Sequence, residues 1–160
     1  MNRWSEFAAT EPEMADFGRR LVYQFGLGLG YIATVRKDGG PRLHPMCPLL
    51  YDDNLYAFIE RSPKLHDLLR DGRYALHSMS APEDDHEFYV TGRGEAVPAD
   101  DQRQHAAWAQ FRRERGDSVS AGEVSTGDVL FELLVDNVLM VDSPGHGHKA
   151  KKTRVWRVPR

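Results

Sequence analysis

Two cationic side chains and a hydroxyl group stand together in Arg61-Ser62-Pro63-Lys64, where an apolar run gives way to a helical pattern. The backbone N–H groups of a first helical turn lack partners and carry the positive end of the helix dipole. A phosphate or carboxylate held there would gain charge-assisted hydrogen bonds from Ser62 and Lys64. The alternative is ordinary capping, with Ser62 as N-cap, Pro63 at the first helical position and both cations in solvent. Taken alone, the stretch favours capping.

A second group of cationic side chains surrounds the turn signal DGG at residues 38–40. Arg36 and Lys37 precede this turn, and Arg42 and His44 follow it. A hairpin closed by the turn would bring the four side chains to one end, where they could line a groove for an anionic ligand. The alternative is that these charges only keep the hairpin end soluble, as is common. For these four residues taken alone, the alternative is favoured.

The sequence contains no familiar catalytic arrangement. The seven histidines are scattered, and there is no HExxH motif, Walker loop or dinucleotide fingerprint. His146 and His148 lack a third ligand at a known spacing, so no metal site is predicted. The single cysteine, Cys47, excludes an intrachain disulfide and is expected to be a buried apolar residue. The sequence therefore names no catalytic residue.

The chain has 160 residues, of which 41% are hydrophobic and 28% charged, and its formal net charge is -3. This length and composition predict a single domain, residues 1–160. The slightly negative charge argues against a nucleic-acid-binding protein. No stretch approaches the ~20 apolar residues of a membrane span, and residues 1–14 lack the apolar core of a signal peptide. We therefore expect a cytoplasmic protein that binds neither nucleic acid nor membrane.

Three helices are predicted to position these side chains. The first follows a capping box that begins at Thr10, the second starts at Pro63 and ends near Gly72, and the third covers about Asp100 to Arg115. The third helix should turn Trp108 and Phe111 inward.

About six or seven strands accompany the helices. The first three, residues 31–37, 41–51 and 55–60, are expected to form an antiparallel meander. Gly92 and Gly94 interrupt the strand 87–97 and indicate a bulge or a tight corner. Residues 129–143 form two strands or one bent strand, and residues 153–158 a last one. Strands in hairpin order predict an α+β antiparallel barrel with flanking helices.

The order of these elements resembles the flavin-binding split β-barrel family related to pyridoxamine 5′-phosphate oxidase. The stretches that carry the resemblance are YIATVRKDGGPRLHPM, LYAFIERSPKLHDLLRDGRYALHS and EFYVTGRGEAV, and it extends from Phe25 to Val97. It implies that backbone groups of the second strand contact the isoalloxazine ring of the cofactor, and that the segment after the third strand binds the cofactor phosphate. The ring-contacting residues would be Leu43, His44, Pro45 and Met46, and the phosphate-binding residues Ser62 and Lys64, with Arg61 just before them.

The resemblance also implies an activity. The protein would be an oxidoreductase that uses FMN or the related deazaflavin, transfers hydride between this cofactor and a small organic substrate, and forms a homodimer with the cofactor at the interface. Basic surface at Arg36, Lys37 and Lys149 to Lys152 would suit the polyglutamate tail of the deazaflavin. Because the family also includes haem-binding members, the alternative is a non-enzymatic protein that stores, carries or senses a flavin or haem.

Overall fold

The computed structural model describes residues 1–116, 128–145 and 147–159. The helices are α1 (Trp4–Thr10), α2 (Pro12–Val22), α3 (Pro63–Arg70) and α4 (Gln102–Arg115). The strands are β1 (Gly30–Val35), β2 (Pro41–Met46), β3 (Pro48–Tyr51), β4 (Asn54–Ile59), β5 (Arg73–Ser78), β6 (Glu87–Ala96), β7 (Val129–Asp142) and β8 (Lys152–Arg157).

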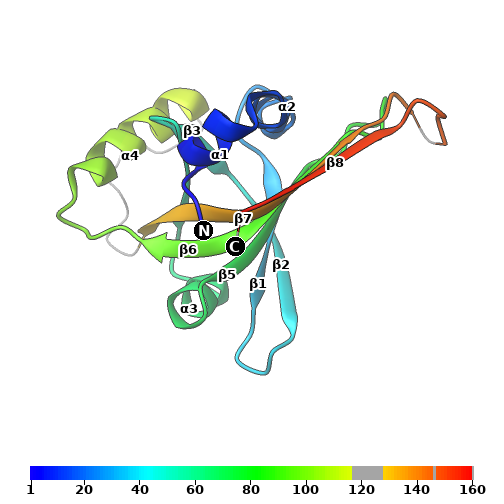
Figure 1. The fold of residues 1–160 in the computed structure, drawn as a ribbon. Helices are drawn as coiled ribbons and strands as arrows, with labels where there is room; N and C mark the ends of the chain where they lie inside the picture. The colour runs from blue at the N-terminus through cyan, green and yellow to red at the C-terminus, as the bar shows by residue number, and fades with distance from the viewer. Residues whose placement is uncertain (117–127, 146, 160) are drawn as a thin grey trace.

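The strands of the described residues form one antiparallel sheet that curls on itself (Figure 1). Seven follow the order β2-β1-β5-β6-β7-β4-β3, and β8 pairs with β7 outside this path. β2 and β3 lie at opposite ends of the order, yet only Cys47 separates them in the chain. This one-residue connection holds the two edges of the curled sheet together. The predicted α+β antiparallel split barrel with flanking helices is therefore confirmed.

The expected three-stranded meander is wrong. Residues 41–51 form two strands, of which β2 pairs with β1 and β3 pairs with β4. Pro45 and Pro48 flank the break between them, and proline cannot donate to a sheet ladder. The sequence thus makes two hairpins that lie at opposite ends of the sheet, with Cys47 as the link.

The long ladder between β6 and β7 is irregular at Gly92, where the sequence predicted a bulge. The register shifts between Thr91 and Gly92, which leaves Asp136 of β7 as an extra residue. A Cβ atom on Gly92 would lie only 1.8 Å from the carbonyl oxygen of Leu134. β7 accordingly runs as one bent strand and not as two.

Gly92→Ala is expected to destabilise the protein by about 1–3 kcal/mol, because the added methyl group collides with backbone that cannot rotate away. Gly94→Ala on the same strand is the matched control, since its Cβ would meet the Phe131 side chain at 3.3 Å. Urea unfolding of both variants measures the difference. Equal stabilities would show that the close backbone approach at Gly92 does not constrain the strand.

A short helix that the sequence did not predict, α1, covers one end of the barrel. Its aromatic side chains are buried, and the Trp4 ring lies 5.3 Å from that of Phe7 and 5.8 Å from that of Phe88. The Thr10 hydroxyl donates to the Phe7 carbonyl at 2.9 Å, at the end of α1. The predicted capping box at the start of α2 is therefore wrong, because Thr10 belongs to the preceding helix.

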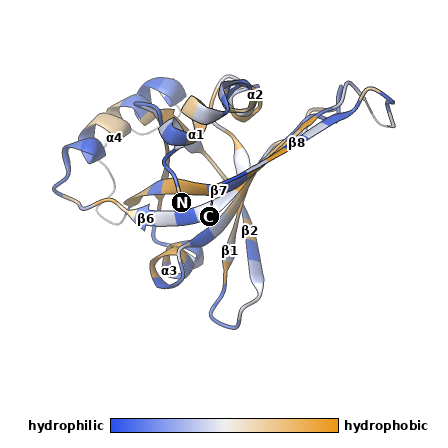
Figure 2. Cartoon of the chain, in the orientation of Figure 1, coloured by the Kyte–Doolittle hydropathy of each residue, from blue (hydrophilic) through white to orange (hydrophobic). Residues whose placement is uncertain are grey.

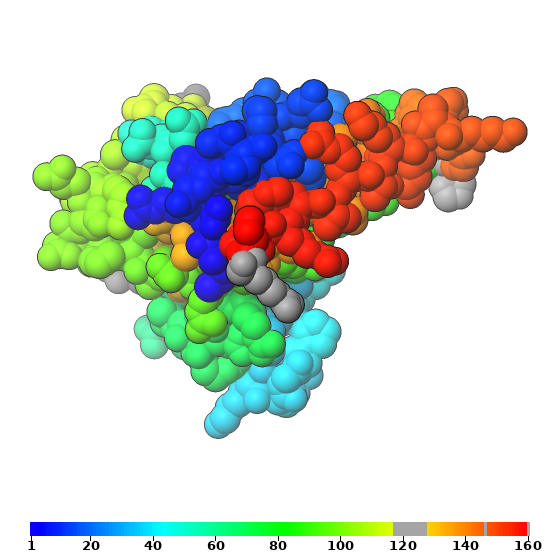
Figure 3. All heavy atoms as spheres, in the orientation of Figure 1, coloured from blue at the N-terminus to red at the C-terminus, as the bar shows by residue number. Residues whose placement is uncertain are grey.

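Two segments project from the barrel: the β1–β2 hairpin and the far end of the β7–β8 hairpin (Figure 3). Hydrophobic residues gather on the barrel strands, whereas the tips of both projections are more hydrophilic (Figure 2). None of the helices in the described ranges has the length and apolar character that crossing a membrane requires.

Candidate functional site

The start of α3 carries the residues that the sequence singled out. Ser62 takes the N-cap position and Pro63 the first helical position, as predicted. However, the Ser62 side chain does not cap the helix; its Oγ donates to the carbonyl oxygen of Glu60 at 3.0 Å. Lys64 is half-buried, whereas Arg61 is exposed. Of the two cations, Lys64 is therefore the one held close to the body of the protein.

A buried carboxylate fixes α3 against the first hairpin. Asp67 is 4% exposed and accepts hydrogen bonds from Thr34 Oγ1 of β1 at 3.0 Å and from Arg42 Nε of β2 at 2.7 Å. Arg70 Nη1 of α3 donates to the same carboxylate at 3.3 Å, and its Nη2 donates to the Val35 carbonyl. Arg42 therefore helps to hold α3 in place. It is not simply a solvated member of the cationic group around the DGG turn.

Burial alone would raise the pKa of Asp67. The hydrogen bonds from Arg42, Thr34 and Arg70 outweigh this effect and lower the pKa below its ordinary value of 3.8. Asp67 is consequently ionised at neutral pH and neutralises cationic charge at the base of α3.

His44 lies on the same side of β2 as Arg42. Burial lowers the pKa of His44, and the positive charges of Lys64 and Arg42 lower it further, against the opposing effect of Asp67. The imidazole is therefore neutral at pH 7. Its Nε2 atom is buried and has no hydrogen-bond partner among the described residues. An unpartnered buried nitrogen beside two cations marks a place where a polar ligand group would be stabilised.

The end of β2 and the start of α3 meet in a cleft of about 290 Å³. The cleft combines the end of β2, the end of β4, the start of α3, the middle of α4 and the residue before β7. Its lining residues are Pro45, Met46, Cys47, Phe58, Glu60, Lys64, Trp108, Phe111 and Asp128. Cys47, expected to be buried, is half-buried and lines this cleft.

Three aromatic rings form one wall of the cleft. The Phe58 ring of β4 lies 5.1 Å from Trp108 and 5.5 Å from Phe111 of α4. Trp108 and Phe111 are stacked at 5.6 Å. The indole Nε1 of Trp108 is buried without a partner among the described residues. The sequence predicted that Trp108 and Phe111 turn inward, but it gave no sign that they face Lys64.

α4 is held beside the cleft by Tyr23, just after α2. The Tyr23 hydroxyl accepts from the Leu50 backbone N–H at 2.9 Å and donates to Glu114 Oε1 at 3.4 Å. Burial raises the pKa of Tyr23 to about 12, so the phenol remains a neutral donor. One side chain thus ties α2, β3 and α4 together and fixes the aromatic wall.

The structure brings together only some of the predicted site residues. Pro45, Met46 and Lys64 line the same cleft, and His44 lies within the electrostatic influence of Lys64. Ser62 adjoins Lys64, Arg61 is exposed, and Leu43 points outward with 66% exposure.

Arg36 lies at the hairpin turn and not in the cleft lining. It forms two hydrogen bonds with Asp38, at 3.1 and 2.7 Å, and borders a surface hollow with Lys37 and Arg42. Lys149, Lys151 and Lys152 lie at the tip of the β7–β8 projection; His146 falls outside the described residues.

The outer face of the sheet carries an unusual row of side chains. The strand registers align residues from six strands, and this row consists of Pro45, Tyr31, His77, Tyr89, Leu139 and Val155. Tyr31 and Val155 are among the exposed large hydrophobic residues of the protein.

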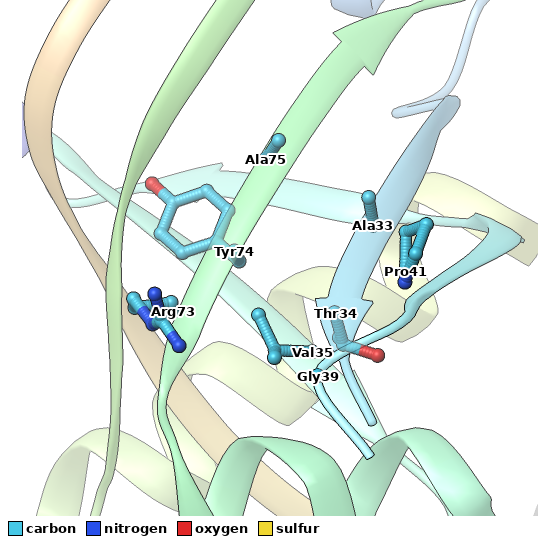
Figure 4. A pocket seen from close by; sticks show the side chains of 8 residues that line it. All are labelled: Ala33, Thr34, Val35, Gly39, Pro41, Arg73, Tyr74 and Ala75. Carbon is cyan, nitrogen blue, oxygen red and sulfur yellow. The ribbon is translucent and has the colours of Figure 1, made fainter. Parts of the chain in front are cut away.

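Beside the row is a hollow of about 240 Å³ whose floor is made by Ala33, Val35 and Ala75 (Figure 4). Pro41 and Arg73 border it, and the exposed Leu43 pairs with Ala33 on the neighbouring strand. Pro45 belongs both to the row and to the cleft, so the apolar outer face is continuous with the cleft.

Solved structures with this fold include proteins with different ligands. A haem storage protein from Vibrio cholerae is 15% identical, with a TM-score of 0.66 over 86% of this chain and 98% of that chain. A haem-binding protein from Mycobacterium smegmatis is 18% identical, with a TM-score of 0.62 over 86% of this chain, which spans only 57% of the mycobacterial one. An FAD-binding protein from Mesorhizobium loti is 24% identical, with a TM-score of 0.56 over 69% and 82% of the two chains.

At these identities the likenesses show the fold alone. Among curated proteins, none matches the sequence. The profile of the pyridoxamine 5′-phosphate oxidase family matches residues 22–142, which include every strand of the barrel except β8 and also α3 and α4. Because this match spans well over half of the chain, the protein belongs to the pyridoxamine 5′-phosphate oxidase family.

Proposed function

We propose that the protein is an oxidoreductase that binds FMN or a deazaflavin in the cleft between β2, α3 and α4. The observation that carries this proposal is that Pro45, Met46 and Lys64 line one cleft. In the sequence, the β3–β4 hairpin separates Met46 from Lys64. The family includes such oxidoreductases as well as non-enzymatic haem-binding members.

The residues of the cleft fit a flavin-type cofactor in three respects. Lys64 supplies a positive charge for a phosphate, and His44 offers an unpartnered nitrogen in the same electrostatic environment. The aromatic wall gives a flavin-type enzyme an apolar side of the cleft for its substrate. A cleft of about 290 Å³ is close to the lower limit of roughly 300 Å³ for small-molecule sites, so a second subunit would supply the rest of the enclosure.

A flavin or deazaflavin supplies the hydride-transfer chemistry when it is bound. The chain's own contribution is to bind and orient. Lys64 and Ser62 would hold the phosphate end, the backbone of residues 43–46 would bind the ring, and the aromatic wall would exclude water. The small organic substrate would enter the part of the cleft beside Trp108 and Phe111.

The surface hollow at the turn of the β1–β2 hairpin is an observation that favours the deazaflavin. Arg36, Lys37 and Arg42 border it, and cationic side chains of this kind would attract an anionic tail. Because Arg36 and Arg42 are paired with Asp38 and Asp67, their attraction is partly offset. FMN therefore remains an equal candidate.

The outer face of the sheet supports the proposal of a homodimer. A row that exposes large apolar side chains, here Tyr31 and Val155, commonly marks an interaction surface, and a symmetric dimer would bury it against its own copy. Since Pro45 joins the row to the cleft, the partner subunit would complete the cofactor site.

Leu43→Asp is expected to convert the dimer to monomer, because it places a charge on an exposed apolar position of β2, beside the row proposed as the interface. Leu69→Asp is the matched control, since Leu69 is also exposed, at 57%, but lies on α3. Light scattering coupled to size-exclusion chromatography measures the mass of each variant. A monomeric parent protein, or a variant pair with the same mass, would contradict the proposed interface.

The absorption and mass spectra of the ligand that copurifies with the protein test the proposed cofactor. Flavin or deazaflavin absorbance is expected, whereas a Soret band would favour the haem alternative. His44 is the observation behind that alternative, because a neutral imidazole can bind iron. Its buried Nε2 would first have to become accessible.

Turnover separates an enzyme from a carrier. The reduced cofactor on the protein is expected to be reoxidised by at least one member of a panel of quinones, nitro compounds and enones. Binding without turnover of any acceptor would support the non-enzymatic alternative.

A further inference from the structure

Two carboxylates, those of the exposed Glu60 and the half-buried Asp128, line the cleft just beyond the end of a strand ladder. The ladder between β4 and β7 ends at the pair Ile59–Val129, so the next residue on each side is Glu60 and Asp128. Both line the cleft. Like charges near each other at the end of a strand pair repel, and the negative charge of Glu60 acts on Asp128. A positive charge bound beside both carboxylates would offset this repulsion.

The pKa of Asp128 reflects its burial and the nearby carboxylate of Glu60. Burial raises the pKa of Asp128, and the negative charge of Glu60 raises it further. Among the described lining residues, Lys64 is the one cation. One lysine can compensate only one of the two carboxylates, so a negative charge without a cationic partner remains among these lining residues.

The aromatic wall also favours a cation. The π faces of Trp and Phe attract positive charge within about 6 Å of the ring centroid. The protein already uses this interaction on Phe111, because the guanidinium carbon of Arg115 lies 4.6 Å from the ring centroid. The remaining aromatic surface of the cleft comes from Phe58 and Trp108.

A metal ion fits the site less well than an organic cation does. In the described ranges, no group of three or more His, Cys, Asp or Glu side chains could hold a metal ion. Two carboxylates beside three aromatic rings instead match a ligand with a charged end and an apolar body.

We propose that the cleft recognises an organic cation, a protonated amine on an aromatic or apolar body. Glu60 and Asp128 bind the ammonium group, and Phe58 and Trp108 pack against the body. The assignment of this ligand as the substrate rests on the proposed function; its recognition by the cleft does not.

Three probes that share a scaffold and differ in charge test the proposal: phenethylammonium, phenethyl alcohol and phenylacetate. The indole N–H signal of Trp108 in NMR titrations reports occupancy of the cleft, and the buried Trp4 serves as an internal reference. Phenethylammonium is expected to bind at least tenfold more tightly than the alcohol, and phenylacetate to bind most weakly.

The double variant Glu60→Gln/Asp128→Asn keeps the shape of both side chains and removes their charge. It should lower phenethylammonium affinity about tenfold, to that of the alcohol, and leave the alcohol unchanged. Asp52→Asn/Asp53→Asn, at the opposite end of β4, is the matched control and should behave as the parent. Absence of binding, equal affinity for the three probes, or a cation preference that survives the double variant would overturn the proposal.

An FMN titration of the same samples distinguishes the two proposals. A parent protein that binds FMN but shows no preference for the cation would overturn the ligand assignment alone. A preference for the cation without FMN binding would support the ligand assignment and contradict the proposed cofactor.

Discussion

Replacing Lys64 with alanine is expected to weaken FMN binding by about 10- to 100-fold. A hydrogen bond to a charged group contributes roughly 1.5–3 kcal/mol, and each 1.4 kcal/mol corresponds to a factor of ten in affinity. Lys64 is the half-buried cation at the start of α3 and shares the cleft with Pro45 and Met46. Flavin fluorescence titrations of the parent and the variant measure the change.

Lys149→Ala is the control for this experiment, because Lys149 is an exposed lysine on the distant β7–β8 projection. It should bind FMN as the parent does. Circular dichroism of both variants establishes that the fold is retained. An unchanged FMN affinity in Lys64→Ala would remove the phosphate assignment.

Asp67→Ala is expected to lower the free energy of unfolding by about 3–5 kcal/mol, the usual effect of removing one partner from a buried ion pair. The loss would leave Arg42 and Arg70 without their carboxylate and Thr34 without its acceptor. Asp38→Ala is a suitable contrast, since Asp38 pairs with Arg36 at the exposed hairpin turn. Urea unfolding should show a much smaller loss of stability for this exposed pair, which solvent screens.

The same carboxylate predicts a dependence of stability on pH. Because the folded-state pKa of Asp67 lies below its ordinary value of 3.8, the ionised group stabilises the fold above that pH. This contribution is lost as the pH falls below 3.8 and through the folded-state pKa. Asp67→Asn should therefore unfold with a flatter acid dependence than the parent. Parallel pH profiles for the two proteins would contradict the assignment.

Local sequence signals predicted much of the fold correctly. The DGG turn closes the first hairpin with Gly39 at a φ of 84°, a conformation that suits glycine. Gly92 marks the bulge, and Pro63 begins α3. These features depend on neighbouring residues, so the chain itself carries the information.

Features that depend on distant contacts were missed. The break at Cys47 was hidden because either side of it reads as strand, and only the pairing partners differ. α1 is a seven-residue helix whose stability comes from packing of Trp4 and Phe7 in the core, not from its own sequence.

The candidate site divides in the same way. The backbone run through Pro45 and Met46 and the cation Lys64 could be named from the sequence. The pairing of Arg42 with Asp67, which removes Arg42 from the expected cluster, depends on the docking of α3. Glu60 and Asp128 become neighbours only through the register of β4 with β7.

The most direct test of the central claim is a parallel titration of the protein with FMN, deazaflavin and haem, monitored by absorbance and repeated with Lys64→Ala. We expect one of the two flavin-type cofactors to bind stoichiometrically to the dimer, with affinity reduced in the variant. Tight binding of haem alone, or no binding of either flavin-type cofactor, would contradict the account.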